Sequence, residues 1–298
     1  MASAETQPAT FDLSHQSSPI VLGATSLVGE FLVNRLADAG VGVIALSREP
    51  QAPRPGVNWL TGDLRTLDLP DENQARTAFS VSPIWHLPAS LPALHRYGVI
   101  RLVAFSSTSL FTKANSPVAS ERDVAQLLMK GEAQTQAFCQ EHGITWTILR
   151  PTVIYAEGKD RSITRLASLI RRVRLMPLAG DAVGRRQPVH ADDLAAGAIA
   201  AAATRATANR AYEVPGGETL TFRAMIERIF EGMGRRPRIV SIPPPVWRLG
   251  IWLASAWMSG VTTEMGSRMS QDLVFDSSAA ERDFNWRPRG FRPRFPEG

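Results

Sequence analysis

A loop near the start of the chain has the glycine spacing of a phosphate-binding turn. Gly23 and Gly29 enclose Ala-Thr-Ser-Leu-Val, between an apolar run at 19–22 and a helical pattern at 27–36. In such a turn the first glycine permits the tight bend and the last lets the helix pack closely on the strand. The pyrophosphate of a dinucleotide then rests on the helix N-terminus. The middle position, usually a glycine, is Ser26, whose Cβ narrows the approach while its hydroxyl can donate to a phosphate oxygen. The alternative is a strand–turn–helix corner without a ligand.

The end of the expected second strand carries a basic residue where a dinucleotide site contacts the ribose. Ser47 and Arg48 follow the apolar run at 42–46. An acidic residue there binds the ribose 2′-hydroxyl of NAD, whereas a guanidinium pairs with the 2′-phosphate of NADP. Arg48 therefore favours NADP(H) over NAD(H). The alternative is a solvated surface arginine, because only Lys113, Lys130 and Lys159 among the 33 basic residues are lysines.

The elements that must position these residues alternate along the chain as in α/β proteins. The runs at 19–22 and 42–46 flank one helical pattern, which makes a βαβ unit with parallel strands. We expect a Rossmann-type, doubly wound parallel sheet with a smaller C-terminal α/β substrate region. The expected division is a disordered polar tail at 1–18, a dinucleotide-binding domain at 19–155 and a partly interleaved substrate-side region at 156–298. The further expected strands are 58–60, 84–87, 101–105, 145–149, 187–189, 212–214 and 238–242, and the further helices are 119–142, 163–173, 191–203 and 222–232.

The composition is that of a folded protein in a reducing compartment. Of the 298 residues, 44% are hydrophobic and 20% are charged, which is enough for a sizeable core. The single cysteine, Cys139, excludes an intramolecular disulfide and a cysteine-built metal site, and we expect it to be a small buried hydrophobe. No stretch resembles a signal peptide. The longest apolar run, 246–261, contains Arg248 and is short for a membrane span, so we expect a cytoplasmic protein.

Six segments, in order along the chain, resemble the motifs of a known family. Together they resemble the extended short-chain dehydrogenase/reductase family, of the NAD-dependent epimerase/dehydratase type, over nearly the whole chain. The resemblance implies a Rossmann fold, a nicotinamide cofactor and hydride transfer. The six segments are Gly23–Gly29, Gly62–Leu64, His86–Ala89, Phe105–Thr108, Arg150–Tyr155 and Pro188–Ala195.

The resemblance also implies roles for single residues. Thr108 occupies the place of the catalytic Ser/Thr hydroxyl, and Asp63 and Leu64 are similar to the pair that flanks the adenine. Asp192 and Asp193 match a segment that starts a helix, so we expect a capping role rather than a magnesium site. The cofactor-binding residues that we expect are Gly23, Thr25, Ser26, Leu27, Val28, Gly29, Ser47, Arg48, Asp63, Leu64, Leu87, Pro88, Ala89, Lys130, Pro151 and Val153.

The active-site helix departs from the family's pattern. The family places a Tyr four residues before a Lys on one helical face, where the ammonium lowers the pKa of the phenol that serves as acid and base. Here the Lys slot is Lys130 and the Tyr slot is Gln126, which has no titratable proton. Lys130 could hold the nicotinamide ribose and polarise a carbonyl, or act as the acid–base itself, as some Tyr-less relatives are thought to do. The alternative is a solvated helix lysine. In addition, only eleven residues separate Ala89 from Arg101, where the family has a longer loop and helix.

Basic clusters and one apolar segment indicate partners. Arginines gather at 161–174 and at 185–186, which suits a nucleotide-sugar pyrophosphate, anionic lipid headgroups or simple solubility. The segment 246–261 holds tryptophans that spread around a helix, which indicates a peripheral membrane or protein partner, or packing within a C-terminal lid. The histidines lack metal-ligand spacing, and no basic strip with interleaved aromatics occurs, so we expect neither a metal site nor nucleic-acid binding.

Two hypotheses of function follow. The first is an atypical NAD(P)-dependent oxidoreductase or epimerase-like enzyme, in which Thr108 orients the substrate oxygen and Lys130 stabilises the developing charge. Its substrate would be a nucleotide sugar or another anionic carbonyl compound. The second is a non-catalytic NAD(P)H-binding structural or regulatory protein, similar to the accessory subunit of respiratory complex I that has this fold. The missing Tyr favours the second hypothesis, whereas Lys130 and Thr108 favour the first.

Overall fold

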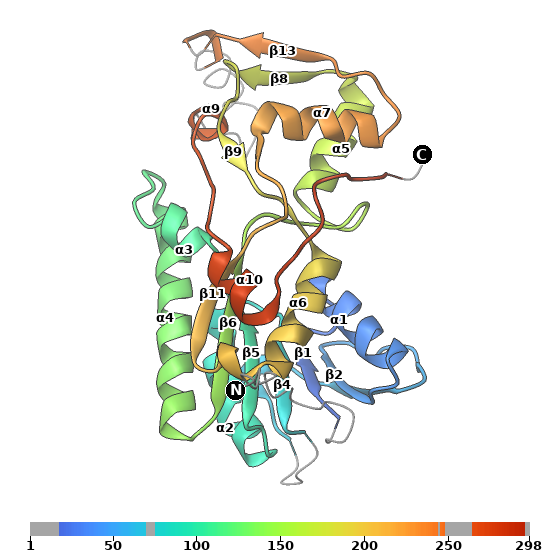
Figure 1. Cartoon of the computed structure of the whole chain (residues 1–298), viewed down its shortest axis with the longest axis vertical. Helices are drawn as coiled ribbons and strands as arrows, with labels where there is room; N and C mark the ends of the chain where they lie inside the picture. The colour runs from blue at the N-terminus through green and yellow to red at the C-terminus, as the bar shows by residue number, and fades with distance from the viewer. Residues whose placement is uncertain (1–17, 70–74, 244, 248–263, 296–298) are drawn as a thin grey trace, which may run out of the picture. The chain divides into compact units, whose positions relative to one another are not determined.

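A seven-stranded parallel sheet forms the centre of the larger of two units in the computed structural model, which describes residues 18–69, 75–243, 245–247 and 264–295 (Figure 1). The strand order is β11-β6-β5-β4-β1-β2-β3. The strands β1, β2, β4 and β5 are buried along their whole lengths, because helices cover both faces of the sheet. The expected Rossmann-type doubly wound fold is thereby confirmed. The strands are β1 (Ile20–Leu22), β2 (Val43–Ser47), β3 (Val57–Thr61), β4 (Thr77–Ser80), β5 (Arg101–Phe105), β6 (Thr145–Pro151) and β11 (Arg210–Val214).

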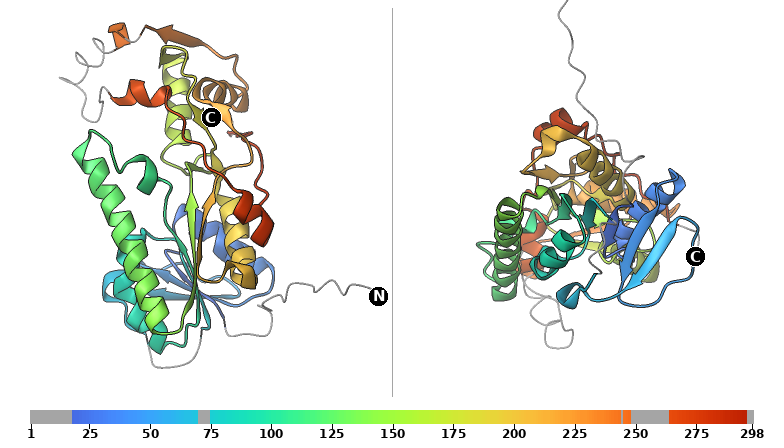
Figure 2. Two further views of the ribbon diagram at one scale, coloured as in Figure 1. Left: turned by 60° about the vertical axis from the view of Figure 1, so that its left-hand side comes forward. Right: turned by 90° about the horizontal axis from the view of Figure 1, so that it is seen from below.

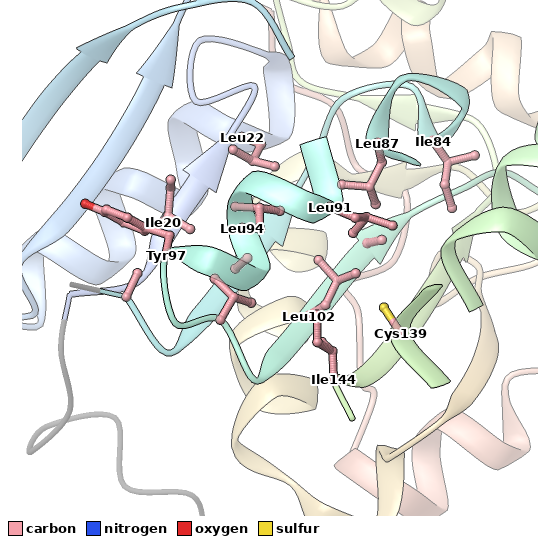
Figure 3. Packing of buried hydrophobic residues seen from close by; sticks show 14 of the residues in the cluster. Ile20, Leu22, Ile84, Leu87, Leu91, Leu94, Tyr97, Leu102, Cys139 and Ile144 are labelled. Atoms are coloured by element: carbon pink, nitrogen blue, oxygen red, sulfur yellow. The ribbon is translucent and has the colours of Figure 1, made fainter. Parts of the chain in front are cut away.

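Two pairs of helices cover the sheet of this unit. The helices α1 (Leu27–Asp38) and α6 (Ala191–Ala203) lie together on one face, and α2 (Leu87–Arg96) and α4 (Ala119–Glu141) lie on the other (Figure 2). Figure 3 shows Leu94 of α2 near Leu22 of β1 and Leu91 of α2 near Leu102 of β5, all within one buried cluster. Cys139 of α4 belongs to the same cluster and is fully buried, as expected, and burial raises the pKa of its thiol to about 12. The unit also contains η1 (Leu64–Thr66), η2 (Ile84–His86), α3 (Ser109–Thr112), η3 (Arg205–Thr207) and α10 (Ser278–Phe284).

The strand expected at 84–87 is wrong. Residues Ile84–His86 form the 3-10 helix η2, and Leu87 begins α2. A short apolar run does not distinguish a strand from a buried helix, and here Leu87, Leu91 and Leu94 follow the helical period and are buried. The strand at this place in the sheet is instead β4, whose sequence Thr-Ala-Phe-Ser is too short and too polar at its ends to stand out.

The second unit comprises Val153–His190, Pro215–Phe275 and Pro288–Gly298, so the chain passes between the two units several times. Three two-stranded sheets pair β7 with β10, β9 with β12 and β8 with β13. Its own core includes Tyr155, Ile170, Ile226 and Phe230. Its elements are β7 (Ile154–Tyr155), α5 (Ile163–Val173), β8 (Met176–Ala179), β9 (Arg185–Arg186), β10 (Val189–His190), β12 (Leu220–Thr221), α7 (Phe222–Gly232), β13 (Ile239–Ile242) and α9 (Glu264–Met269).

Two of the expected features fall mainly outside the described residues. These are the polar tail, of which residues 1–17 are not described, and the apolar segment 246–261, of which only 246 and 247 are described. None of the described helices combines the length and the apolar composition needed to cross a bilayer.

Candidate functional site

A pocket of about 470 Å³ opens at the carboxyl ends of the central strands of the larger unit. Strand β1 lies between β2 and β4, so the direction in which strands are added reverses at this point. Crevices at such switch points are where open α/β sheets bind their ligands. The pocket is lined by Gly23, Thr25, Ser26, Leu46, Ser47, Arg48, Gly62, Asp63, Leu64, Arg65, Val81, Ser82, Pro83 and His86.

The glycine loop has the backbone that a dinucleotide site requires. Gly23 has a φ of 77°, a conformation that side chains rarely adopt, and a Cβ there would collide with the hydroxyl of Ser82. A Cβ on Gly29 would overlap the carbonyl oxygen of Gly23, so the close packing of α1 on the loop depends on this glycine. The Ser26 hydroxyl caps α1 by accepting a hydrogen bond of 3.1 Å from the Gly29 amide, and its own proton stays free to donate.

Two arginines lie at the far end of the pocket, around Asp63. The Asp63 carboxylate accepts hydrogen bonds from the Arg65 amide (2.8 Å) and guanidinium (3.0 and 2.9 Å). These hydrogen bonds hold the pKa of Asp63 well below its usual range, so the carboxylate stays charged. Arg48, by contrast, forms no hydrogen bond or ion pair within the part of the chain that the structure describes. The pocket therefore contains one engaged guanidinium and one available guanidinium.

The segment after β4 reaches the pocket with different residues from those expected. Val81, Ser82 and Pro83 follow β4 directly and line the pocket, together with His86. Leu87 is instead buried in the core at the start of α2. The turn signal of Ser82-Pro83 after a short strand could have identified this loop. The apolar run at 84–87 is more obvious, and it places the predicted turn at 86–89 instead.

Pro88 and Ala89 lie in the first turn of α2, after Leu87. Five further expected cofactor residues divide into two groups. Leu27, Val28 and Gly29 form the first turn of α1, directly beside the pocket loop. Pro151 ends β6 in the larger unit, whereas Val153 belongs to the second unit.

Thr108 is buried against β6, with its hydroxyl engaged. Both its amide and its Oγ1 donate to the carbonyl oxygen of Pro151, each at 3.1 Å. Two residues earlier, the buried hydroxyl of Ser106 has no hydrogen-bond partner among the described residues. Ser107, between them, accepts a hydrogen bond of 3.1 Å from the Ser109 amide. Of the three hydroxyls that follow β5, those of Ser106 and Ser107 therefore keep a proton to donate.

Helix α4 turns Lys130 and Gln126 away from the sheet. Leu128 and Glu132 are buried on its inner side, whereas Lys130 and Gln126 are exposed. A step of two residues rotates a side chain by about 200° around a helix, so Lys130 lies opposite Leu128. Two residues on the inner side of α4 are four positions apart, as the family's Tyr and Lys are. They are Val124, which is half-buried against the core, and Leu128, and both are apolar.

A glycine fixes this rotation of α4. A Cβ on Gly131 would come within 2.9 Å of the backbone of Trp85, so the close approach of α4 to η2 at this position requires glycine. The buried carboxylate of Glu132 also binds the Arg150 guanidinium, with hydrogen bonds of 3.0 and 2.5 Å. Arg150 reaches Glu213 as well, at 3.1 Å, so it links α4, β6 and β11.

The arginines expected at 185–186 are occupied within the second unit. Arg185 pairs with Asp272 at 2.7 Å. Arg186 is buried and donates to the main-chain carbonyls of Gln271 and Arg268. These two arginines are therefore structural in the conformation described.

Comparison with known proteins agrees with this geometry. The model of the NAD dependent epimerase/dehydratase family matches residues 90–214. The 2-alkyl-3-oxoalkanoate reductase of Stenotrophomonas maltophilia is 23% identical, over 91% of this chain and 94% of its own length. A solved structure of MoeE5 in complex with UDP-glucuronic acid and NAD has a TM-score of 0.70 at 19% identity, and covers 92% of this chain and 94% of its own. The resemblance to the extended short-chain dehydrogenase/reductase family is confirmed.

A further relative of this family is named for a different role. The protein called NADH dehydrogenase [ubiquinone] 1 alpha subcomplex subunit 9, from the mitochondria of Arabidopsis thaliana, is 24% identical over 76% of this chain and 60% of its own length. The extended short-chain dehydrogenase/reductase family is NAD(P)-dependent. Two of the relatives that this chain matches are named as reductases.

Proposed function

We propose that this chain binds NADP(H) and catalyses hydride transfer between the nicotinamide and a carbonyl or carbinol carbon of a small substrate. The observation that carries the proposal is the pocket at the switch point of the sheet. It joins a glycine loop, a capped helix N-terminus and the available guanidinium of Arg48.

Each of these groups has a part in binding the dinucleotide. The first amides of α1 lack partners within the helix and carry its positive dipole end, which suits a pyrophosphate. Arg48 would pair with the 2′-phosphate, while Arg65 keeps Asp63 ionised beside it. The close contacts that a Cβ would make at Gly23 and Gly29 support the proposal, because a tight glycine turn that packs closely on the helix is what a dinucleotide loop needs.

We infer that the proton for the reaction does not come from α4. When bound, the cofactor supplies or accepts a hydride. Reduction of a carbonyl leaves an alkoxide oxygen that needs a proton. Val124 and Leu128 on the inner side of α4 have none to give, and Lys130 is on the outer side. We infer that water supplies it, oriented by the serine hydroxyls that follow β5, of which Ser106 and Ser107 both keep a proton to donate.

The substrate that we propose is an anionic carbonyl compound, such as a 3-oxoalkanoate or a nucleotide sugar. Support comes from the relatives' names: one is a reductase of 2-alkyl-3-oxoalkanoates, and MoeE5 is described in complex with UDP-glucuronic acid. Both compounds carry negative charge. The overall excess of basic residues, 33 against 28 acidic residues, is compatible with such a ligand.

The test is cofactor binding followed by turnover. We expect NADPH to bind more tightly than NADH in a fluorescence titration, and bound NADPH to be consumed with at least one member of a panel of 3-oxo acids, other ketones and nucleotide sugars. If neither dinucleotide binds, the assignment of the pocket is wrong.

A second candidate is a non-catalytic NADP(H)-binding protein with a structural or regulatory role. The apolar Val124 and Leu128 on the inner side of α4 favour it, because neither can exchange a proton. The relative named as a subunit of a respiratory complex gives it further support. Tight NADPH binding without consumption across the whole panel would favour this candidate over the first.

A further inference from the structure

A second pocket, on the second unit, is lined almost entirely by arginines. Its volume is about 390 Å³, and it is open to solvent. Arg174, Arg235, Arg236 and Arg238 surround it, and the buried ring of Phe230 forms its apolar floor. We call these five residues the arginine pocket. It is separate from the cofactor pocket, with which it shares no lining residue.

Two chain connections meet at the arginine pocket. One runs from α5 to β8 through Arg174, and the other from α7 to β13 through residues 233–238. The Arg235 guanidinium donates to the carbonyl of Arg171 at 3.3 Å, and the amide of Met176 donates to the carbonyl of Arg238 at 2.8 Å. These bonds, together with the parallel pairing of β8 and β13, hold the connections side by side.

The position of Arg174 is unusual for an arginine. It caps α5 with a φ of 62°, in the left-handed region, and its amide donates to Ile170 at 2.8 Å. Helices usually end in this conformation with glycine or asparagine, because other side chains adopt it at a cost. Here the position contributes a guanidinium to the arginine pocket instead.

No carboxylate neutralises this cluster within the part of the chain that the structure describes. Arg174, Arg236 and Arg238 form no side-chain hydrogen bond or ion pair there, and Arg235 reaches only a main-chain oxygen. Elsewhere in the same unit, Arg185 pairs with Asp272 and Arg228 with Glu218. The ends of α5 and α7 favour nearby cations, but they leave most of the guanidinium donors without acceptors. Four like charges around one hollow are therefore suited to an external anion.

Exposed aliphatic side chains adjoin the arginines along the same connections. Val173 and Leu175 flank Arg174 and are 46% and 37% exposed, and Val240, two residues after Arg238, is 50% exposed. Strand β13 places Val240 opposite Pro177, so these residues belong to one small sheet and the turns that lead into it. A soluble anion needs only the charges. Aliphatic groups beside unpaired cations are typical of a surface that lies on a membrane.

We propose that the arginine pocket and its aliphatic neighbours Val173, Leu175 and Val240 form a docking surface for an anionic membrane. The guanidiniums bind the lipid phosphates, and the aliphatic side chains enter the boundary between headgroups and acyl chains. The surface consists of described residues alone and does not depend on the function proposed for the cofactor pocket.

The test is co-sedimentation of the full chain with vesicles of phosphatidylcholine, with or without phosphatidylglycerol, at physiological ionic strength. We expect binding to the anionic vesicles only, weakening as salt is raised. Because each arginine near such a surface contributes roughly a fivefold factor, the double variant Arg236→Gln/Arg238→Gln should bind roughly 25-fold more weakly. Val173→Ser/Val240→Ser should also weaken binding, and its remaining binding should be more sensitive to salt.

The matched control is Arg205→Gln/Arg287→Gln. Both residues are exposed, belong to the larger unit and form no side-chain hydrogen bond or ion pair with other described residues. Each arginine double variant lowers the formal net charge of +5 by two, and every variant keeps residues 244–263 unchanged. We therefore expect the control to bind nearly as well as the original chain.

Three outcomes would overturn the proposal. Equal losses in the two arginine variants would mean that net charge alone drives binding. Unchanged binding by Arg236→Gln/Arg238→Gln would place the contact elsewhere. Binding of inorganic pyrophosphate by calorimetry, lost in that variant, without vesicle binding would show that the pocket takes a soluble phosphate compound instead.

Discussion

Arg48 and Arg65 both line the cofactor pocket, but their chemical states differ. Arg65 is committed to Asp63 through its side chain and its amide, whereas Arg48 forms no hydrogen bond or ion pair with a described residue. A guanidinium that is already paired contributes little to a new anion, because the first interaction must be broken. The proposed preference for NADP(H) therefore rests on Arg48.

We expect Arg48→Ala to weaken NADPH binding by about 10-fold or more and to leave NADH binding nearly unchanged. A charge-assisted hydrogen bond contributes about 1.5–3 kcal/mol, and only NADPH carries the 2′-phosphate. Fluorescence titration with both cofactors measures the difference. Arg96→Ala, which removes a half-exposed arginine of the same unit, is the control. Equal weakening of both cofactors would assign Arg48 a general role in the pocket rather than a selective one.

Ser106 and Lys130 differ in where their side chains lie: the Ser106 hydroxyl is buried at the end of β5, whereas Lys130 is exposed on α4. In the arrangement described, Lys130→Ala should leave turnover unchanged, because its ammonium lies on the outer side of α4. Ser106→Ala should lower kcat by about 10-fold to 100-fold with little change in cofactor affinity, if its hydroxyl orients the proton-donating water. Steady-state kinetics on a substrate from the panel measures both. A large loss in Lys130→Ala would instead restore the catalytic role that the sequence suggests.

Among the elements, β5 is held to its neighbours by one buried cation. The Arg101 side chain is 2% exposed and has no carboxylate partner among the described residues. Its guanidinium donates to the carbonyls of Ala201 (2.9 Å) and Ala202 (3.3 Å) and to the hydroxyls of Thr147 (2.7 Å) and Thr207 (2.9 Å). Burial lowers the pKa of Arg101 to about 10, so the group remains charged at neutral pH. It ties β5 to β6, α6 and η3.

We expect Arg101→Lys to lower the free energy of unfolding by about 2–4 kcal/mol. An ammonium has three donors on one atom and cannot reach acceptors spread over three elements, so buried acceptors lose their partners. Urea denaturation followed by circular dichroism measures the change. Arg205→Lys, at an exposed position of the same unit, should change stability by less than about 0.5 kcal/mol. A similar small effect for Arg101→Lys would mean that the acceptors find other partners.

At the scale of the whole molecule, the order of the chain does not follow the order of the units. Residues Ala191–Val214 and Asp276–Arg287 return to the larger unit after the chain has entered the second. They supply α6, which covers one face of the sheet beside α1, and β11, which pairs with β6 along its length. They also supply the two carbonyls of α6 that accept from Arg101.

A fragment that ends at Thr152 should therefore lack a cooperative thermal transition. Without α6 and β11, one face of the sheet and the edge of β6 are exposed, and Arg101 loses part of its acceptors. A fragment that ends at Val214 retains these elements and should unfold more cooperatively. Thermal unfolding followed by circular dichroism compares the two. A sharp transition in the shorter fragment would show that its six strands, β1 to β6, and its helices α1 to α4 form an independent core.

Sequence patterns alone determined the glycine loop, most helices and strands of the parallel sheet, and the place of Arg48 directly after β2. These features depend on residues that are close together in the chain, where apolar spacing and turn residues dictate local structure. The same patterns missed β4 and placed its following turn at 86–89, because four short, partly polar residues carry too little periodicity.

Only the tertiary structure decided which of the candidate groups point where chemistry can occur. The rotation of α4 is set by the contact between Gly131 and the backbone of Trp85, which are 46 residues apart in the sequence. The hydroxyl of Thr108 is engaged because Pro151 lies against it, and the arginine pocket exists because two distant connections meet. Such contacts depend on close packing between remote segments, and a local pattern of residue types carries no record of them.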